Sequence, residues 1–380
     1  MTSGPRPKLA LVLTGGGARA AYQVGVLRAL ARRFPDLEFP IITGVSAGAI
    51  NASILAAHDG SFASAIERLA TLWSTLTFDD VFHADAPRLA FSVVKWGVRL
   101  VSGGSKLAPP TRGMVDTAPL RRFLERALAA EGGVVPGIAR NVERGRLLAL
   151  GITTTNYATG QSVTWCQGKN PRLWLRPQRK AIAHDVSVDH VLASAALPLF
   201  FPAVEVNGEY HGDGGIRLAA PLAPALHLGA DRILAISNRY ERTLAEAERP
   251  EVHGYPPPAQ VASVLLNAIF LDMIDFDAMY LARVNALVRA LPPEQRGELK
   301  HCDLVVMRPS VDIGRLAGQL ESELPRAFRF FSRGLGTKET SSPDSLAMLM
   351  FDPEFTKRLL EIGEKDGDAR IDELTRFVTG

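Results

Sequence analysis

The chain has 380 residues, of which 47% are hydrophobic and 22% are charged, a composition typical of soluble globular proteins rather than disordered or fibrous ones. The 43 lysines and arginines outnumber the 40 aspartates and glutamates by so little that a dedicated nucleic-acid-binding protein is excluded, although an anionic membrane would not be repelled. The two cysteines, Cys166 and Cys302, lie far apart and match no metal-binding spacing, so we expect buried thiols rather than a disulfide framework or a zinc site.

The amino-terminal segment does not have the pattern of a secretory signal. Basic residues precede an apolar run, but that run covers only Leu9 to Leu13 and is ended by glycines, whereas a signal peptide needs a longer one. No window approaches the roughly 18 uninterrupted apolar residues of a membrane span. We therefore expect a cytoplasmic protein, with peripheral contact to a membrane left open.

The first 60 residues contain the same local pattern twice. A buried strand is predicted for residues 8–13, followed by a glycine turn and a helix over 19–33. The short apolar run "PIITG" then leads directly into the alanine-rich helical pattern "VSAGAINASILAAH". Strand, turn and helix in succession favour an α/β protein in which crossover helices connect parallel strands.

Residues 78–115 are less regular and predict an insertion over one end of the sheet. The segment "RLAFSVVKWGVRLV" within it favours a surface helix, with membrane contact as the alternative. The next helix has Asp116 or Thr117 as its N-cap and Pro119 in its first turn.

Strands and turns follow in the middle of the chain. "GRLLALGITTTN" and "QSVTWCQ" predict two strands, and "VSVDHVLASAALP" predicts a short helix ended by Pro198. "VEVNGEYHGDGG" predicts a hairpin with Asn207 and Gly208 at its tip. "DRILAIS" predicts another buried strand.

Beyond residue 240 the pattern becomes mainly helical. "LAEAERPEVHGYPPP" is typical of a linker, and Ala259 to Leu291 predicts a long helix that packs in a core or dimer interface, or else binds an acyl chain. The strand "CDLVVMRP" follows. Asp366 and Asp368 superficially fit a calcium loop, but Ala369 replaces its glycine and the closing acid is missing, so we expect a polar connector between two helices.

The strongest chemical motif is "GVSAG", Gly44 to Gly48, between a predicted strand and helix. A tight turn there would lift the Ser46 hydroxyl clear of the sheet, and the flanking glycines would remove side chains that clash. The helix N-terminus beyond it favours developing negative charge. The structural alternative is that Ser46 is a plain helix N-cap.

An activated serine needs a base, and the best candidate is Asp213 in "HGDGG". Glycines on both sides let a carboxylate on a turn approach another backbone closely, although they also suit a structural turn. A histidine base in the order Ser-Asp-His would have to be His227, His253 or His301, for which packing or surface roles are favoured.

The glycine run in "TGGGARAAY" has two interpretations. Amides without side chains at a helix N-terminus suit the oxyanion of acyl transfer. The same stretch satisfies GxGxxA through Gly15, Gly17 and Ala20, with Asp36 about 20 residues on, so a dinucleotide-binding fold is the rival.

Four motifs in order carry a resemblance to a known family. "GGGARAAYQVGVL", "GVSAGAIN", "ASAALPLFFP" and "DGG" resemble those of the patatin-like phospholipases, which are serine acyl hydrolases. This resemblance implies a Ser46–Asp213 dyad and a three-layer α/β/α fold with a mostly parallel central sheet and a C-terminal helical extension. It also implies an oxyanion loop and supporting residues, which are Gly15, Gly16, Gly17, Arg19, Gly44, Gly48, Gly214 and Gly215.

The resemblance covers roughly residues 8–240, so we expect a catalytic core there and a mainly helical extension over 241–380. It implies hydrolysis of lipid or acyl-ester substrates without metal or cofactor. A nucleotide-dependent enzyme using NAD or FAD at the first glycine turn, a lipid acyltransferase and a catalytically silent lipid-binding protein remain as alternatives. The lipid, the acyl position and the oligomeric state are left open.

Overall fold

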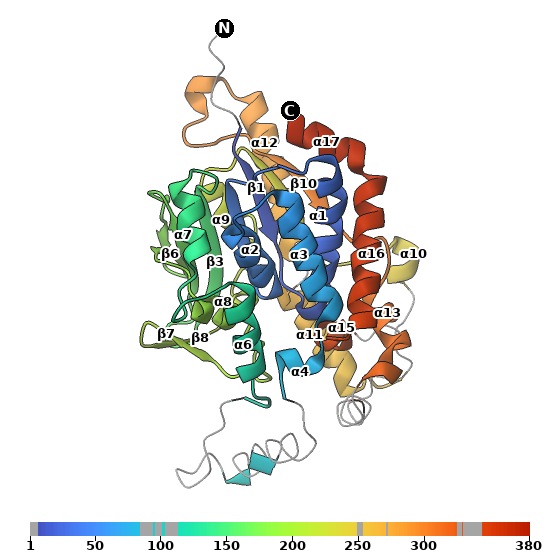
Figure 1. Cartoon of the computed structure of the whole chain (residues 1–380). Helices are drawn as coiled ribbons and strands as arrows, with labels where there is room; N and C mark the ends of the chain where they lie inside the picture. Colours follow the sequence, from blue (N-terminus) through green and yellow to red (C-terminus); the bar gives the residue numbers. More distant parts are fainter. Residues whose placement is uncertain are drawn as a thin grey trace.

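A ten-stranded mixed sheet forms the centre of the computed structural model, with helices on both faces (Figure 1). The strand order is β10-β9-β1-β2-β3-β4-β6-β5, and β8 pairs with β3 and with β7 off this path. The structure describes residues 7–83, 94–95, 101–102, 113–248, 254–270, 273–324, 329 and 344–380.

The parallel part of the sheet contains the first two predicted strands at its centre. Its strands are β1 (Leu9–Leu13), β2 (Ile41–Val45), β3 (Ala149–Asn156), β9 (Arg232–Ile236) and β10 (Asp303–Met307). Because these strands run the same way, the turns that follow β1 and β2 lie at one edge of the sheet. The two predicted glycine turns are therefore neighbours.

An antiparallel hairpin reaches the same edge from the other direction. The remaining strands are β4 (Ser162–Gly168), β5 (Leu175–Arg176), β6 (Arg179–Ala183), β7 (Val204–Val206) and β8 (Glu209–Asp213). The hairpin β7–β8 turns at Asn207 and Gly208, as the sequence predicts, and both residues have positive φ. Since β8 runs antiparallel to β3, its last residue, Asp213, lies opposite Thr154 near the carboxyl end of β3.

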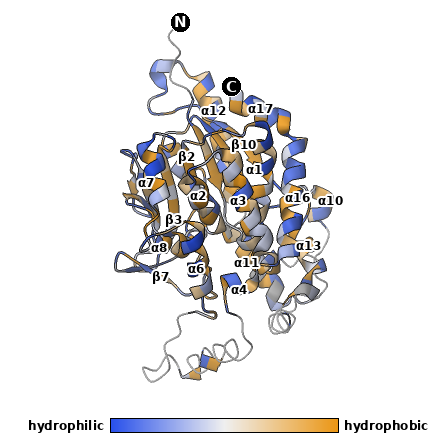
Figure 2. Cartoon of the chain, in the orientation of Figure 1, coloured by the Kyte–Doolittle hydropathy of each residue, from blue (hydrophilic) through white to orange (hydrophobic). Residues whose placement is uncertain are grey.

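The strands alternate between two cores, which is why the fold has three layers. In β1, Leu11 and Leu13 face one core, whereas Ala10 and Val12 face the other. Figure 2 shows the hydrophobic residues gathered on these central strands. The three-layer α/β/α fold with a mostly parallel sheet, expected from the resemblance, is confirmed.

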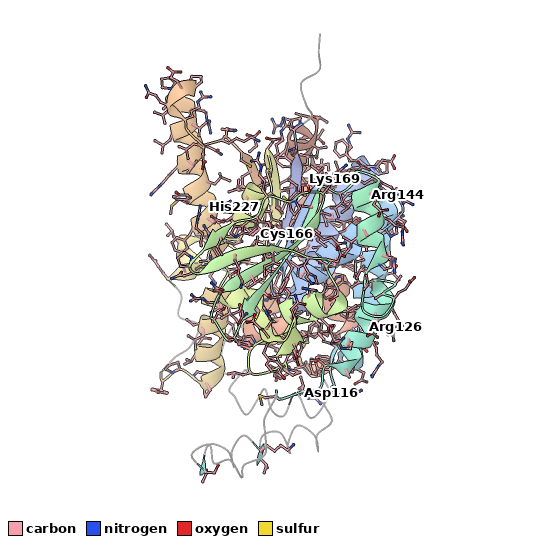
Figure 3. All side chains as sticks on the ribbon, turned by 90° about the vertical axis from the view of Figure 1, so that its left-hand side faces the viewer. Asp116, Arg126, Arg144, Cys166, Lys169 and His227 are labelled. Atoms are coloured by element: carbon pink, nitrogen blue, oxygen red, sulfur yellow. The ribbon has the colours of Figure 1, made fainter. Side chains whose placement is uncertain are left out.

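The larger core lies under most of the helices. They are α1 (Ala21–Arg33), α2 (Ala47–Ala57), α3 (Phe62–Thr75), α4 (Phe78–Val81), α6 (Ala118–Ala127), α7 (Pro136–Glu143), α8 (Val188–Ser194), α13 (Ile313–Gln319), α15 (Asp344–Leu349), α16 (Pro353–Ala369) and α17 (Ile371–Thr379). α9 (Ala223–His227) and α12 (Met273–Ala290) cover the smaller core on the opposite face. Both cysteines are free and buried, as expected. Figure 3 shows Cys166 in the sheet and His227 toward the α12 side.

The last long helix packs against the first one with unusually close backbones. A Cβ atom on Gly25 of α1 would lie 2.1 Å from the Leu360 carbonyl oxygen, and one on Gly363 of α16 would lie 2.2 Å from that of Tyr22. β10 also belongs to the central sheet. The division into a core over 8–240 and an extension over 241–380 stays a prediction, but the later segment contributes to the sheet and to the larger core.

Two local expectations need correction. The supposed connector around Asp366 and Asp368 is helical through Ala369, so it cannot form a calcium loop. The long helix predicted from Ala259 is described as α11 (Pro258–Phe270) and α12, and residues 271–272 between them lie outside the described residues. The expected linker contains α10 (Leu244–Ala247), which Thr243 and Glu246 cap reciprocally. Most of the expected insertion and its helix over 88–101 lies outside the described residues.

Candidate active site

Ser46 stands on a strained turn between β2 and α2. Its φ of 56° and ψ of −133° are conformations that a residue with a side chain rarely adopts. Neighbouring glycines make the turn fit: a Cβ atom on Gly48 would lie 2.3 Å from the Leu13 carbonyl oxygen, and one on Gly44 would lie 2.5 Å from that of Gly48. Ser46 occupies the N-cap position of α2, yet its hydroxyl accepts no capping hydrogen bond. The N-cap interpretation therefore does not account for this serine.

A second serine, which sequence reasoning did not single out, holds the turn in place. The backbone amide of Ser46 donates to Ser194 Oγ over 3.0 Å, and the Ser194 hydroxyl donates to the Thr153 carbonyl oxygen over 2.6 Å. Ser194 is fully buried and belongs to the "ASAALP" segment that carries part of the family resemblance. That segment supports the Ser46 turn directly.

Asp213 is fixed at the end of β8 through its backbone and one carboxylate oxygen. Its amide donates to the Ala196 carbonyl oxygen over 3.1 Å, and its own carbonyl accepts from Thr155 Oγ1 over 2.8 Å. Oδ1 accepts the Gly215 amide over 2.8 Å. Gly214 must lack a side chain, because a Cβ atom there would lie 2.1 Å from the Thr153 carbonyl oxygen.

The structure brings Ser46 and Asp213 together and places the carboxyl in a dry environment. Asp213 has no exposed surface, and burial raises its pKa from 3.8 to about 7, although the Ser46 hydroxyl and the Gly215 amide lower it somewhat. The other oxygen, Oδ2, is buried and forms no hydrogen bond of regular geometry with a described residue. A carboxyl with a pKa near neutrality can exchange a proton with a nearby hydroxyl.

In the glycine loop between β1 and α1, carbonyl groups accept hydrogen bonds from the protein, whereas the amides of residues 15–17 have no partner among the described residues. The carbonyl oxygens of Thr14 and Gly15 accept from Gln23 Nε2 and Asn238 Nδ2 over 2.8 and 2.7 Å. Within the described part of the chain, the amides of residues 15–17 donate to no protein acceptor. These amides are available to an oxyanion or another anionic group.

Glycine is required in this loop for conformation and for space. Gly16 and Gly17 have φ of 143° and 58°. A Cβ atom on Gly17 would lie 2.0 Å from the Met348 carbonyl oxygen in α15. A residue more than 300 positions away in the sequence therefore covers the loop.

Arg19 acts as an anchor beneath the loop. Its side chain is 2% exposed and forms an ion pair with Asp344 at the start of α15. Its Nη2 also donates to the Asp344 carbonyl oxygen over 2.7 Å. Arg19 is not among the residues that line the cavity at Ser46; it connects the glycine loop to α15.

An apolar cavity, partly open to solvent, lies over Ser46. Gly16, Gly17 and the turn of Ser46 and Ala47 form its polar end. The rest of the wall is hydrophobic and comprises Ile50, Ile54, Leu69, Leu72, Trp73, Leu76, Val81, Leu120, Phe123, Ala195, Leu197, Phe201, Met348, Leu349 and Phe351. A hydrophobic chain fits this wall, with its polar end at Ser46.

The structure places two of the three candidate histidines in packing or surface roles. His227 stacks on Trp174, with ring centroids 4.7 Å apart, and His301 lies 3.6 Å from Asp303. His253 lies outside the described residues. His211 precedes Asp213 by two residues, and its Nδ1 is 3.0 Å from Thr154 Oγ1. Among the described residues, no group of histidine, cysteine or acidic side chains could hold a metal ion.

The dinucleotide interpretation of the glycine loop does not fit the sheet. Asp36 precedes β2 and is exposed at the amino ends of the strands. The glycine loop follows the carboxyl end of β1. A ribose-binding acid has to lie near the carboxyl end of the second strand, so Asp36 cannot serve that purpose.

The chain belongs to the patatin-like phospholipase family, whose model matches residues 11–226. Family membership places it among lipid-ester hydrolases. No curated protein sequence matched. Within the described residues, no helix is both long and apolar enough to cross a bilayer.

Solved structures similar to this chain share little of its sequence. VipD from Legionella pneumophila is 16% identical, with a TM-score of 0.40, 98% of this chain covered and 68% of that chain. Human GIVD cytosolic phospholipase A2 is 12% identical, with a TM-score of 0.44 and coverage of 98% and 60%. The type III effector protein ExoU is 16% identical, with a TM-score of 0.39 and coverage of 98% and 54%. The chain thus spans from about half to two thirds of these proteins.

Proposed function

We propose that this protein cleaves carboxylic esters of lipids through an acyl-enzyme, with Ser46 as nucleophile and Asp213 as the base. The observation that carries the proposal is the placement of Ser46, on a strained turn, against a buried carboxyl at the polar end of an apolar cavity. A weak nucleophile such as serine needs an adjacent base.

In the first half-reaction, ionised Asp213 accepts the Ser46 proton as the serine oxygen attacks the ester carbonyl carbon. The amides of Gly16 and Gly17 stabilise the resulting oxyanion. When the tetrahedral intermediate collapses, the bond to the alcohol or lysolipid breaks. The leaving oxygen takes the proton from Asp213, and the acyl group stays on Ser46.

In the second half-reaction, water replaces the alcohol. Asp213 accepts a proton from water, and the hydroxide oxygen attacks the acyl carbon. Collapse releases a carboxylic acid, and Ser46 recovers its proton from Asp213. A second lipid in place of water would make the enzyme an acyltransferase, with the same residues in the same roles.

The cavity supports a lipid acyl group as the substrate part held by the protein. Its wall beyond the glycine loop is formed by aliphatic and aromatic side chains, which favour a hydrocarbon chain over a polar group. The carbonyl to be attacked then lies between Ser46 and the free amides.

The test is hydrolysis of p-nitrophenyl acyl esters and phospholipids by wild type, Ser46→Ala and Asp213→Asn. A fluorophosphonate label located by mass spectrometry identifies the nucleophile. We expect both variants to lose turnover and the label to lie on Ser46. Turnover that survives in Ser46→Ala would overturn the proposal. Saturable NAD or FAD binding to an inert wild type would favour the nucleotide alternative.

A further inference from the structure

α11 buries two of its polar side chains and turns apolar side chains toward solvent. Ser263 is 2% exposed, and its hydroxyl donates to Ser345 Oγ over 3.0 Å. Asn267 Nδ2 donates to Asp344 Oδ2 over 2.6 Å. The side chains that face solvent instead are Val261, Val264 and Leu265, which are 48%, 57% and 58% exposed. We call these three residues the α11 face.

α11 also has no charge on either side. None of its residues, "PAQVASVLLNAIF", carries a charged side chain. A helix that packs on a core normally buries its apolar stripe and exposes its polar residues. A contiguous apolar face turned outward is typical of a surface that contacts another molecule.

The α11 face lies next to the candidate active site. Leu266 and Ile269, on the inner side of α11, pack against Met348. Met348 lines the cavity over Ser46 and also covers Gly17. Figure 1 shows α11 at the same end of the molecule as α4 and α6, which contribute cavity residues.

Three arginines border the same helix. Arg176, Arg179 and Arg217 line a hollow together with Ala268 and Ile269 of α11. Arg217 Nε donates to the Gly160 carbonyl oxygen over 2.9 Å. None of the three forms an ion pair with a carboxylate of the described residues. Burial raises the pKa of Asp277 in α12, and the charge of nearby Arg179 partly offsets this rise, so the charge of Arg179 is partly compensated. The described residues that line the hollow nevertheless include the three arginines and no carboxylate, together with the apolar edge of α11.

We propose that the α11 face and these three arginines form a docking surface for an anionic lipid bilayer. An anionic bilayer is complementary to both parts of this surface. Its headgroups attract the arginines, and its acyl region accepts the two valines and the leucine. A second copy of the chain would bring arginine clusters of like charge together. The inference deepens the proposed function, since it makes the bilayer the source of the substrate.

Binding is tested on the full chain carrying Ser46→Ala, so that no lipid is consumed. Sedimentation with vesicles of phosphatidylcholine, with and without phosphatidylserine, measures the partition coefficient. The apolar variant combines Val261→Gln, Val264→Gln and Leu265→Gln. The charge variant combines Arg176→Gln, Arg179→Gln and Arg217→Gln.

We expect the wild-type surface to bind vesicles containing phosphatidylserine, less strongly as salt rises. The apolar variant should bind at least about tenfold less, and the charge variant on the order of a hundredfold less. The control variant, Tyr280→Gln with Leu287→Gln, changes side chains of α12 that are 67% and 54% exposed. It should bind like wild type.

Unchanged binding by the apolar variant would overturn the docking surface, as would an equal loss in the α12 control. A wild-type dimer that the apolar variant dissociates would assign the face to self-association instead. A second measurement separates the docking surface from the proposed ester hydrolysis. It is hydrolysis of a water-soluble short-chain p-nitrophenyl ester by the same variants with Ser46 retained. The apolar and charge variants should hydrolyse this ester as fast as wild type does. If the proposed function is wrong, the wild-type protein will not hydrolyse the ester, but it will still bind vesicles.

Discussion

Replacing Asp213 by asparagine is expected to stabilise the protein in mild alkali while it removes the activity. Burial raises the pKa of Asp213 from 3.8 to about 7. A difference of about three pKa units corresponds to about 4 kcal/mol against the ionised form in the folded state. Asparagine keeps an oxygen that can accept the Gly215 amide, but it carries no charge and cannot take a proton from Ser46.

The sign of the effect depends on pH. Below 3.8 the carboxyl is protonated in both the folded and the unfolded state, so it imposes no ionisation penalty. Between 3.8 and about 7 only the folded state keeps the proton, and the wild-type stability that this contributes falls as pH rises. Above about 7 both states are ionised, and the folded state bears the full free-energy cost of the buried Asp213 charge. The asparagine variant has no such cost, because its side chain carries no charge.

Thermal unfolding at pH values near 8 and near 4 measures this difference. With an unfolding entropy of about 2.1 cal/mol/K per residue, 4 kcal/mol corresponds to a rise of about 5 °C in Tm for a chain of this size. The rise should nearly vanish near pH 4. Asp36→Asn, at an exposed turn, is the control and should leave Tm unchanged at both values. A variant no more stable than wild type near pH 8, or a gain independent of pH, would refute the reasoning.

The remaining predictions concern the reaction and the two turns. The wild-type kcat/KM should rise about tenfold per pH unit up to about 7, the pKa of Asp213, and then level off, because the base must be ionised; a flat profile would contradict this. Gly17→Ala should lower kcat/KM more than about tenfold, because the new side chain strains the loop and displaces α15. Gly208→Ala is its control, because Gly208 has open space around it. It should lower the free energy of unfolding by about 1 to 2 kcal/mol and leave activity unchanged. Ser194→Ala should cost about 1 to 3 kcal/mol in chemical denaturation and reduce turnover, because the Ser46 amide loses its acceptor; full activity would show that the turn holds its shape alone.

The parts of the site that could be predicted are those built from short contiguous motifs. The turn at Ser46 and the loop at residues 15–17 each need glycines within a few positions, and such local requirements are visible in a sequence. The β7–β8 hairpin was likewise predicted from Asn207 and Gly208. Its pairing with β3, which brings Asp213 to Ser46, was not predicted. Asp213 itself was a candidate base because of its flanking glycines, and the family resemblance implied the dyad.

The parts that could not be predicted depend on contacts between distant segments. Asn238 and Met348 touch the glycine loop from positions that share no motif with it. Asp366 and Asp368 have the spacing of loop ligands, but packing of α16 on α1 keeps them helical. The exposure of Val264 and Leu265 could not be predicted, because the sequence pattern of an apolar helix does not show whether its face is buried or exposed to solvent.

The close contact of α16 with α1 determines when the fold can be completed during synthesis. Gly25 and Gly363 pack backbone against backbone, so α1 gains this cover only after α16, more than 300 positions later in the sequence, has left the ribosome. β9, which pairs with β1, is translated before α16. Because α15 covers Gly17, the glycine loop between β1 and α1 is expected to become fully ordered only after α15 and α16 have both been translated.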